Sequence, residues 1–112
     1  MFIVVTQIRL KSISKFFKFN ATVNKIAKQI NQSEGNKHFS KRAKWYLDFY
    51  TLTAWDDWKA MLEFRSSGSH LEAMGITREL SDHFRVSHWE ADHVPTWKEA
   101  FDKIDKALWS VE

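Results

Sequence analysis

Two hydrophobic periods follow one another in the first thirty residues, and they predict a strand and then a helix. Within residues 2–10 the apolar side chains occupy both alternating sets of positions near the start, as expected of a strand that is covered on both faces. From Phe16 to Ile30 apolar residues recur at spacings of three and four, with lysines at other positions. This pattern predicts an amphipathic helix with a basic exposed side, which ends in a polar turn at residues 32–36.

The next two segments have the composition of strands. Residues 37–44 are polar and basic, which predicts a strand at or near a sheet edge, where lysine opposes unwanted pairing. Residues 45–55 carry large apolar side chains on both faces, which predicts a strand between two layers. One face would hold Trp45, Leu47 and Phe49, and the other Tyr46, Tyr50 and Leu52. No turn of the Gly-Asn type marks the boundary between the two strands.

A helical region in two pieces should follow. Asp56 and Asp57 suit the start of a helix, because carboxylates cap free N–H groups and complement the helix dipole. The Ser-Ser-Gly sequence at 66–68 should break this helix, and the capping-box pair Ser69 and Glu72 should start another at residue 70. We expect Gly75 to interrupt that second helix before it continues to about residue 83.

The final third predicts a fourth strand and a closing helix. Residues 84–92 have strand character, and Pro95 ends it. The capping-box pair Thr96 and Glu99 then precedes apolar residues at helical spacing. These residues are Trp97, Phe101, Ile104, Leu108 and Val111.

The element order predicts an α+β fold of ferredoxin-like type. It is βαββαβ with a C-terminal helix, and it forms a four-stranded antiparallel sheet within a single domain at residues 1–112. Such a sheet would carry its helices on one face. Because the first and third strands are apolar on both faces, we expect a second copy of the chain to cover the other face, which makes a homodimer through sheet faces.

Composition narrows the class of protein further. The 112 residues are 44% hydrophobic and 15% aromatic, with six Trp and nine Phe, which is globular but rich in aromatic rings. The absence of Cys excludes disulfides, thiolate metal sites and cysteine nucleophiles. No apolar run approaches the roughly 18 residues that span a bilayer, and the start lacks a basic leader and a cleavage site. We therefore expect a soluble, cytoplasmic protein without a membrane partner.

Charge is distributed unevenly along the chain. Residues 1–47 contain ten Lys and Arg but one acid, whereas residues 48–112 contain seven Lys and Arg and thirteen acids. A nucleic-acid surface, complementary ends of a self-associating subunit, or solvated helix faces would each produce this split, and the last is the simplest explanation. RNA-recognition modules of the same element order need a basic-Gly-aromatic pattern, which residues 44–49 lack, and this weighs against a nucleic-acid partner.

His70 is the histidine that stands out as a candidate for chemistry. None of the five histidines has the spacing of a preformed metal site. His70, however, would follow a flexible break and sit at the start of a helix, where the dipole favours a neutral imidazole. A neutral imidazole suits a ligand of haem iron or a proton acceptor beside a pocket. The alternative is that His70 only packs at a helix junction.

An aromatic concentration between residues 45 and 64 indicates a second candidate feature. Phe49, Trp55, Trp58 and Phe64 could line a pocket for a small apolar molecule, such as a flat aromatic or polyene compound. The alternative is that these rings form a bulky core and a dimer interface.

The same region carries a family resemblance, reinforced by the segment at 95–101. The residues concerned are Tyr50-Thr51-Leu52-Thr53-Ala54-Trp55-Asp56, Ala60-Met61, Phe64, Ser67-Gly68-Ser69-His70, Ala73-Met74 and Pro95-Thr96-Trp97-Lys98-Glu99-Ala100-Phe101. They resemble the dimeric α/β-barrel superfamily, in the branch near the antibiotic biosynthesis monooxygenases and the spheroidene-monooxygenase-like proteins of unknown function. The resemblance implies two ferredoxin-like subunits packed sheet against sheet, each with a pocket between sheet and helices.

The resemblance also implies an activity. Members of the superfamily include cofactor-independent quinone-forming monooxygenases and haem-degrading enzymes, which use a pocket Trp and a helix His as axial ligand. Trp55 and His70 occupy similar elements, although the first strand has Thr6 and Gln7 where those enzymes have an Asn. We therefore expect a monooxygenase-like homodimer, with or without haem, in which His70 is a base or an iron ligand. A non-catalytic ligand-binding or stress-associated dimer is the first alternative, and nucleic-acid binding the second.

Overall fold

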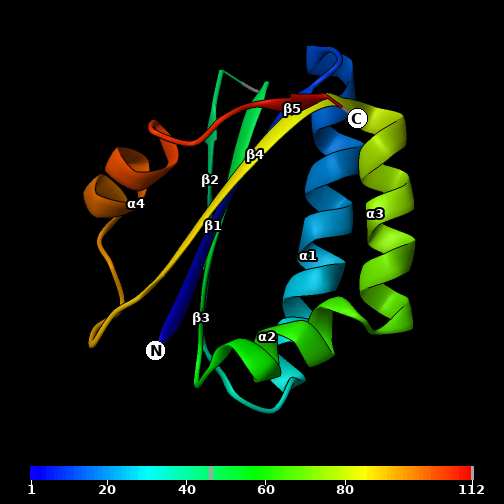
Figure 1. Ribbon diagram of the computed structural model, residues 1–112. Coiled ribbons are helices and arrows are strands. Elements are labelled where there is room, and N and C mark those ends of the chain that lie inside the picture. The colour runs from blue at the N-terminus through cyan, green and yellow to red at the C-terminus, as the bar shows by residue number, and fades with distance from the viewer. Residues whose placement is uncertain (46, 112) are drawn as a thin grey trace.

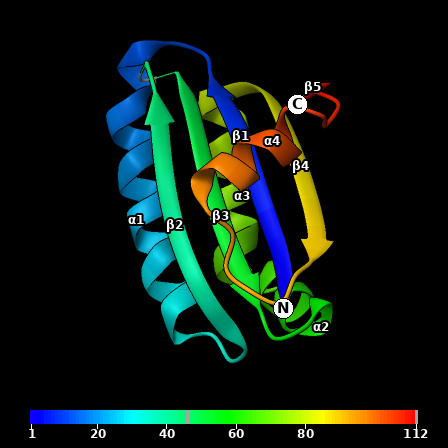
Figure 2. The same ribbon diagram turned by 90° about the vertical axis from the view of Figure 1, so that its left-hand side faces the viewer.

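A sheet of five antiparallel strands runs through the middle of the molecule, in the order β2-β3-β1-β4-β5 (Figure 2). The computed structural model describes residues 1–45 and 47–111, without the side chains of residues 68–73, 110 and 111. The strands are β1 (Phe2–Leu10), β2 (Asn36–Lys44), β3 (Asp48–Trp55), β4 (Ser81–Glu90) and the short β5 (Ser110–Val111). The predicted ferredoxin-like α+β fold is confirmed, with β1 central and β2 at an edge.

Helices cover both faces of this sheet. A short 3-10 helix (Ile13–Lys15) leads into α1 (Phe16–Gln32), and α2 (Trp58–Arg65) and α3 (Gly68–Leu80) lie on the same side as α1. The last helix, α4 (Trp97–Ile104), lies on the opposite side (Figure 1). None of these helices is long and apolar enough to cross a membrane in the part of the chain described.

Side chains of β1 and β3 point alternately to the two faces of the sheet, and each face has its own hydrophobic core. On one face, Ile3, Val5 and Leu52 are almost fully buried beneath α4. On the other face, Leu10 and Phe49 pack against α1 and α3. The double-sided apolar pattern was predicted to need a second chain, but for these residues α4 of the same chain supplies the cover.

The hairpin between β2 and β3 lies where the third strand was predicted to begin. Trp45 has a φ of 57° and is 86% exposed, so it belongs to the turn and not to a buried strand face. The strand itself starts at Asp48. The chain must reverse here without a glycine, and Trp45 takes the left-handed conformation that the reversal requires. Tyr46, predicted for the opposite face, lies outside the described residues.

Helix α3 also departs from its prediction. It starts at Gly68, so Ser69 lies inside its first turn rather than capping it. It then continues through Gly75 to Leu80 without interruption. A glycine in a helix costs only about 1 kcal/mol relative to alanine, which tertiary packing readily offsets.

The predicted closing helix is too long. Helix α4 ends at Ile104, and the side chain of Leu108, which the helical spacing placed on the buried face, is 90% exposed. The ring of Trp109 instead contacts two guanidinium groups, at 4.7 Å from Arg9 and 4.5 Å from Arg85 to its centroid. This cation–π contact turns the chain back to the sheet, where β5 pairs with β4.

Two helix starts predicted from capping residues are confirmed. The Asp57 carboxylate accepts the N–H of Ala60 at 2.9 Å at the start of α2. At the start of α4, Thr96 and Glu99 form the reciprocal capping box. The imidazole of His93 forms hydrogen bonds to Glu99 of this second cap and to Asp92. These two bonds raise the pKa of the imidazole and favour its cationic form.

Ion pairs within the chain join its basic and acidic halves. Three side-chain pairs take their cation from the first 47 residues and their acid from the remainder: Arg9–Asp48 at 2.9 Å, Lys37–Asp56 at 3.1 Å and Lys18–Glu79 at 4.0 Å. A further pair, Arg85–Asp105 at 3.2 Å, lies within the acidic part itself. Surface pairs of this kind contribute about 1 kcal/mol or less each. Part of the charge asymmetry is therefore satisfied inside one molecule.

Gly35 forms the tight turn that brings the end of α1 against α2. Its φ is +84°, and a Cβ atom added there would lie 2.6 Å from the Cβ of Ala60. In the same turn, the N–H of Asp56 donates to the Gly35 carbonyl oxygen at 2.7 Å. Only glycine fits both the conformation and the space.

We expect Gly35→Ala to lower the free energy of unfolding by roughly 1–3 kcal/mol, through left-handed strain and the collision with Ala60. The matched control is Gly75→Ala, since nothing lies within 4 Å of an added Cβ there. This control should raise stability by about 0.5–1 kcal/mol. Urea unfolding of the two variants measures both changes, and a Gly35→Ala protein as stable as the parent would contradict the turn geometry.

Candidate ligand-binding site

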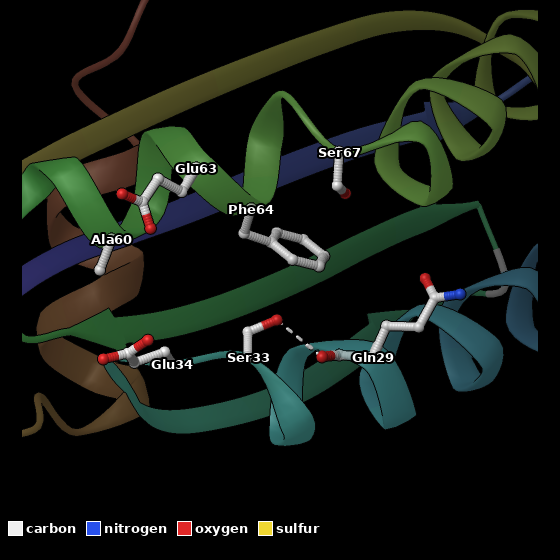
Figure 3. A pocket seen from close by; sticks show the side chains of 7 residues that line it. All are labelled: Gln29, Ser33, Glu34, Ala60, Glu63, Phe64 and Ser67. Atoms are coloured by element: carbon white, nitrogen blue, oxygen red, sulfur yellow. Dashed lines mark hydrogen bonds between the residues drawn. The ribbon is translucent and has the colours of Figure 1, made fainter.

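A cavity of about 300 Å³ opens between the end of α1 and helix α2 (Figure 3). The residues from α1 and the following turn are Gln29, Ser33 and Glu34. Those from α2 and the residues just after it are Ala60, Glu63, Phe64 and Ser67. The Gly35 turn closes one end, because it holds Glu34 beside α2.

An aromatic ring, that of Phe64, lines the cavity. Phe64 points from α2 into the space between the helices, and its ring stacks on Trp55 with a centroid distance of 5.5 Å (Figure 3). Trp55 ends β3 and is 2% exposed. Its indole N–H donates to the hydroxyl of Thr53 at 3.0 Å, which fixes the indole in place. Phe64 is thus a positioned ring, half-buried and supported from behind.

The polar groups of the cavity are divided between its two ends. The carboxylates of Glu34 and Glu63 lie at one end, on opposite walls, and the amide of Gln29 and the hydroxyl of Ser67 lie at the other (Figure 3). Ser33 stands between them and donates its hydroxyl to the Gln29 carbonyl oxygen at 2.7 Å. The lining is therefore more polar than the apolar pocket expected from the aromatic residues.

The predicted pocket residues are only partly brought together. Phe64 lines the cavity, and Trp55 stacks on it from behind without lining the cavity itself. Phe49 lies at the other end of β3, where its ring meets Phe19 at 5.0 Å in the core under α1. Trp58 begins α2 and is 54% exposed, outside the lining.

His70 belongs to the first turn of α3, but its side chain lies outside the described residues. Its backbone follows Ser67 of the cavity by three residues. His70 therefore remains a candidate by position alone.

The lining residues that were not predicted do follow a detectable pattern. Gln29 and Ser33 are four residues apart, which puts Gln29 and the residue that caps the end of α1 on the same side. In α2, the positions 60, 63 and 64 fall on a single helix face for the same reason, and Ser67 follows just after the helix ends. Helical spacing identifies each face separately, but only the tertiary structure shows that these two faces oppose one another.

The described lining residues do not fit a haem. A porphyrin needs broad apolar faces, and its own propionates carry negative charge, whereas this cavity offers one aromatic ring and two carboxylates. No described residue of the lining is a histidine, and the side chains described hold no group of three His, Asp or Glu arranged to bind a metal ion.

The arrangement predicts different effects for two neighbouring aromatic residues of α2. We expect Phe64→Ala to lower the free energy of unfolding by about 2 kcal/mol, because it removes the ring stacked on Trp55. Trp58→Ala should change it by no more than about 0.5 kcal/mol, since most of that side chain is in solvent. Urea unfolding gives both values, and equal losses would show that Trp58 is buried in solution.

Comparison with known proteins places the fold. No family model matches the sequence, and no curated protein matches it. Among solved structures, SnoaB of Streptomyces nogalater, a cofactor-independent oxygenase, is 13% identical with a TM-score of 0.72, over 82% of this chain and 93% of that one. A Nitrosomonas europaea protein provisionally assigned as an antibiotic biosynthesis monooxygenase is 14% identical with a TM-score of 0.76, over 83% and 100%. Rv0793 of Mycobacterium tuberculosis is 11% identical with a TM-score of 0.75, over 85% and 98%. The chain therefore has the ferredoxin-like fold of the antibiotic biosynthesis monooxygenases.

Proposed function

We propose that this protein is an oxygenase-like enzyme that acts on a small aromatic molecule held between α1 and α2. The observation that carries the proposal is the cavity with a positioned aromatic ring, found in a chain that shares its fold with a cofactor-independent oxygenase. Phe64 would stack on the ring of the substrate. The polar lining suits a compact aromatic compound with polar substituents better than a long polyene.

The chemistry would take place on the substrate itself. A base that removes a phenolic proton leaves an electron-rich ring, which can reduce dioxygen directly. One oxygen atom would become a new carbonyl oxygen on the ring as the O–O bond breaks, and the other would leave as water, so that the substrate supplies all the electrons and becomes a quinone. We assign this role to His70, because its backbone lies one helical turn beyond Ser67 of the cavity. No haem is needed for this route, and the described lining does not fit one.

Oxygen uptake tests the proposal directly. With a panel of phenols and naphthols, the protein should consume oxygen above the spontaneous rate, and His70→Ala should lower that rate by about 100-fold through loss of the base. Trp58→Ala is the control, since Trp58 does not line the cavity. Full activity in a folded His70→Ala protein would remove His70 from the mechanism.

A binding protein without catalysis is the second candidate function. The side chains of Glu34 and Glu63 are exposed, so the cavity is open to water, whereas oxygenase sites gain from its exclusion. Ligand capture without oxygen uptake by any compound of the panel would support this candidate against the first.

We extend the proposal to a homodimer formed through the α4 side of the sheet. Trp97 and Phe101 stay partly exposed there, with Arg42 at 5.7 Å and Lys44 at 4.0 Å from their respective ring centroids. A second copy would cover this aromatic surface. Aromatic rings and arginine are the side chains most enriched at protein interfaces.

Sedimentation velocity at micromolar concentration should report about twice the chain mass of 13.3 kDa. We expect Arg42→Glu to shift the protein toward monomer, because it places an acid at the ring of Trp97. Lys25→Glu, on the exposed side of α1, makes the same charge change away from this surface and should leave the dimer intact. A parent protein that sediments as a monomer would contradict the dimer.

A further inference from the structure

We propose that the cavity between α1 and α2 selects a protonated amine attached to an aromatic ring. This inference rests on the proposed function, because it assigns a ligand class to the same site. It follows from the order of chemical groups along the cavity, which is acid, then aromatic ring, then amide and hydroxyl.

The acid end supplies the recognition of charge. Glu34 comes from the turn after α1 and Glu63 from α2, so their carboxylates approach the same end from opposite walls (Figure 3). Neither forms an ion pair with any lysine, arginine or histidine that the structure describes. The nearby Lys37 is held by Asp56 at 3.1 Å. Two uncompensated carboxylates favour an ammonium group, which can donate three hydrogen bonds.

The aromatic middle of the cavity suits the same ligand. The face of Phe64 attracts a cation that approaches it and also stacks on an aromatic ring. Trp55 supports Phe64 from behind, so the ring is held at a fixed position. A ligand ring on Phe64 would therefore place its ammonium arm beside Glu34 and Glu63.

The amide end fits a hydroxyl group on the far side of the ligand ring. The Gln29 side chain is half-buried there, and within the described structure its amide has no hydrogen-bond partner. An amide can both donate to and accept from a phenolic hydroxyl. A hydroxyphenyl-alkylamine matches all three parts of the cavity.

The acidity of the cavity is a local feature that runs against the charge of its surroundings. The chain is net positive, and α1 itself carries Lys18, Lys25 and Lys28. None of these lysines lines the cavity, and Glu34 is the single acid among the first 47 residues of the chain. The positive charge of the surrounding surface would favour an anionic ligand. The pair Glu34 and Glu63 instead favours a cationic ligand in the cavity.

Three probes with the same hydroxyphenyl ring and short arms of different charge test the inference. They are tyramine, which is a cation, tyrosol, which is neutral, and 4-hydroxyphenylacetate, which is an anion. Calorimetric titration at low salt should show tyramine binding about 3- to 10-fold more tightly than tyrosol, because each of two water-exposed carboxylates adds a modest ion-pair attraction. The anion should bind more weakly than tyrosol.

Single variants locate the effect. Glu34→Gln and Glu63→Gln should each weaken tyramine binding by about 2- to 5-fold and leave tyrosol binding unchanged. Asp102→Asn is the matched control, because it removes an exposed acid from α4 on the other side of the sheet. It should change neither affinity.

The outcomes separate this inference from the proposed function. Equal affinity for tyramine and tyrosol, or a tyramine preference that survives both Glu variants, would overturn the amine inference while the aromatic cavity stands. No binding of any of the three probes at millimolar concentration would overturn both. Circular dichroism of each variant confirms that a lost affinity does not come from a lost fold.

Discussion

The central position of β1, with a strand paired along each edge and apolar side chains on each face, is the constraint on which the rest of the molecule depends. Its backbone pairs with β3 on one side and β4 on the other from Phe2 to Arg9, so its polar groups are satisfied within the sheet. Its side chains then require a cover on each face, which α1 and α3 supply on one and α4 on the other. The register opposite Phe2 places Trp55 at the end of β3. Trp55 in turn supports Phe64, and the cavity follows from that contact.

The sequence predicted correctly those elements that are determined by interactions between residues close together in the chain. The caps at Asp57 and Thr96, the spacing through α1 and the double-sided pattern of β1 all describe interactions within a few positions of the chain. Trp45 and the end of α4 were predicted incorrectly for the opposite reason. Trp45 is an aromatic residue next to a strand, and its type favours a longer strand. Leu108 continues the helical spacing of α4, but the next residue, Trp109, contacts two arginines that are distant in the sequence, and the chain there no longer follows a helix.

The candidate site was predictable in its aromatic part and not in its polar part. Trp55 and Phe64 stood out by residue type, and they do meet. Glu34 and Glu63 are 29 positions apart, and each looks like an ordinary surface acid until the Gly35 turn packs against α2. The fold brings the ends of two helices together, and these side chains give the cavity between them its chemistry.

The open edge at β2 has a consequence for the behaviour of the protein in concentrated solution. Lys41, Arg42 and Lys44 are distributed along a strand that lacks a neighbour on its outer side within the described sheet. Like charges oppose each other when two such edges approach, which protects the free backbone groups from pairing between molecules. At physiological ionic strength, salt largely screens this repulsion between charges that are more than about 8–10 Å apart. The colloidal stability of the protein should therefore be greater in dilute buffer than in concentrated salt.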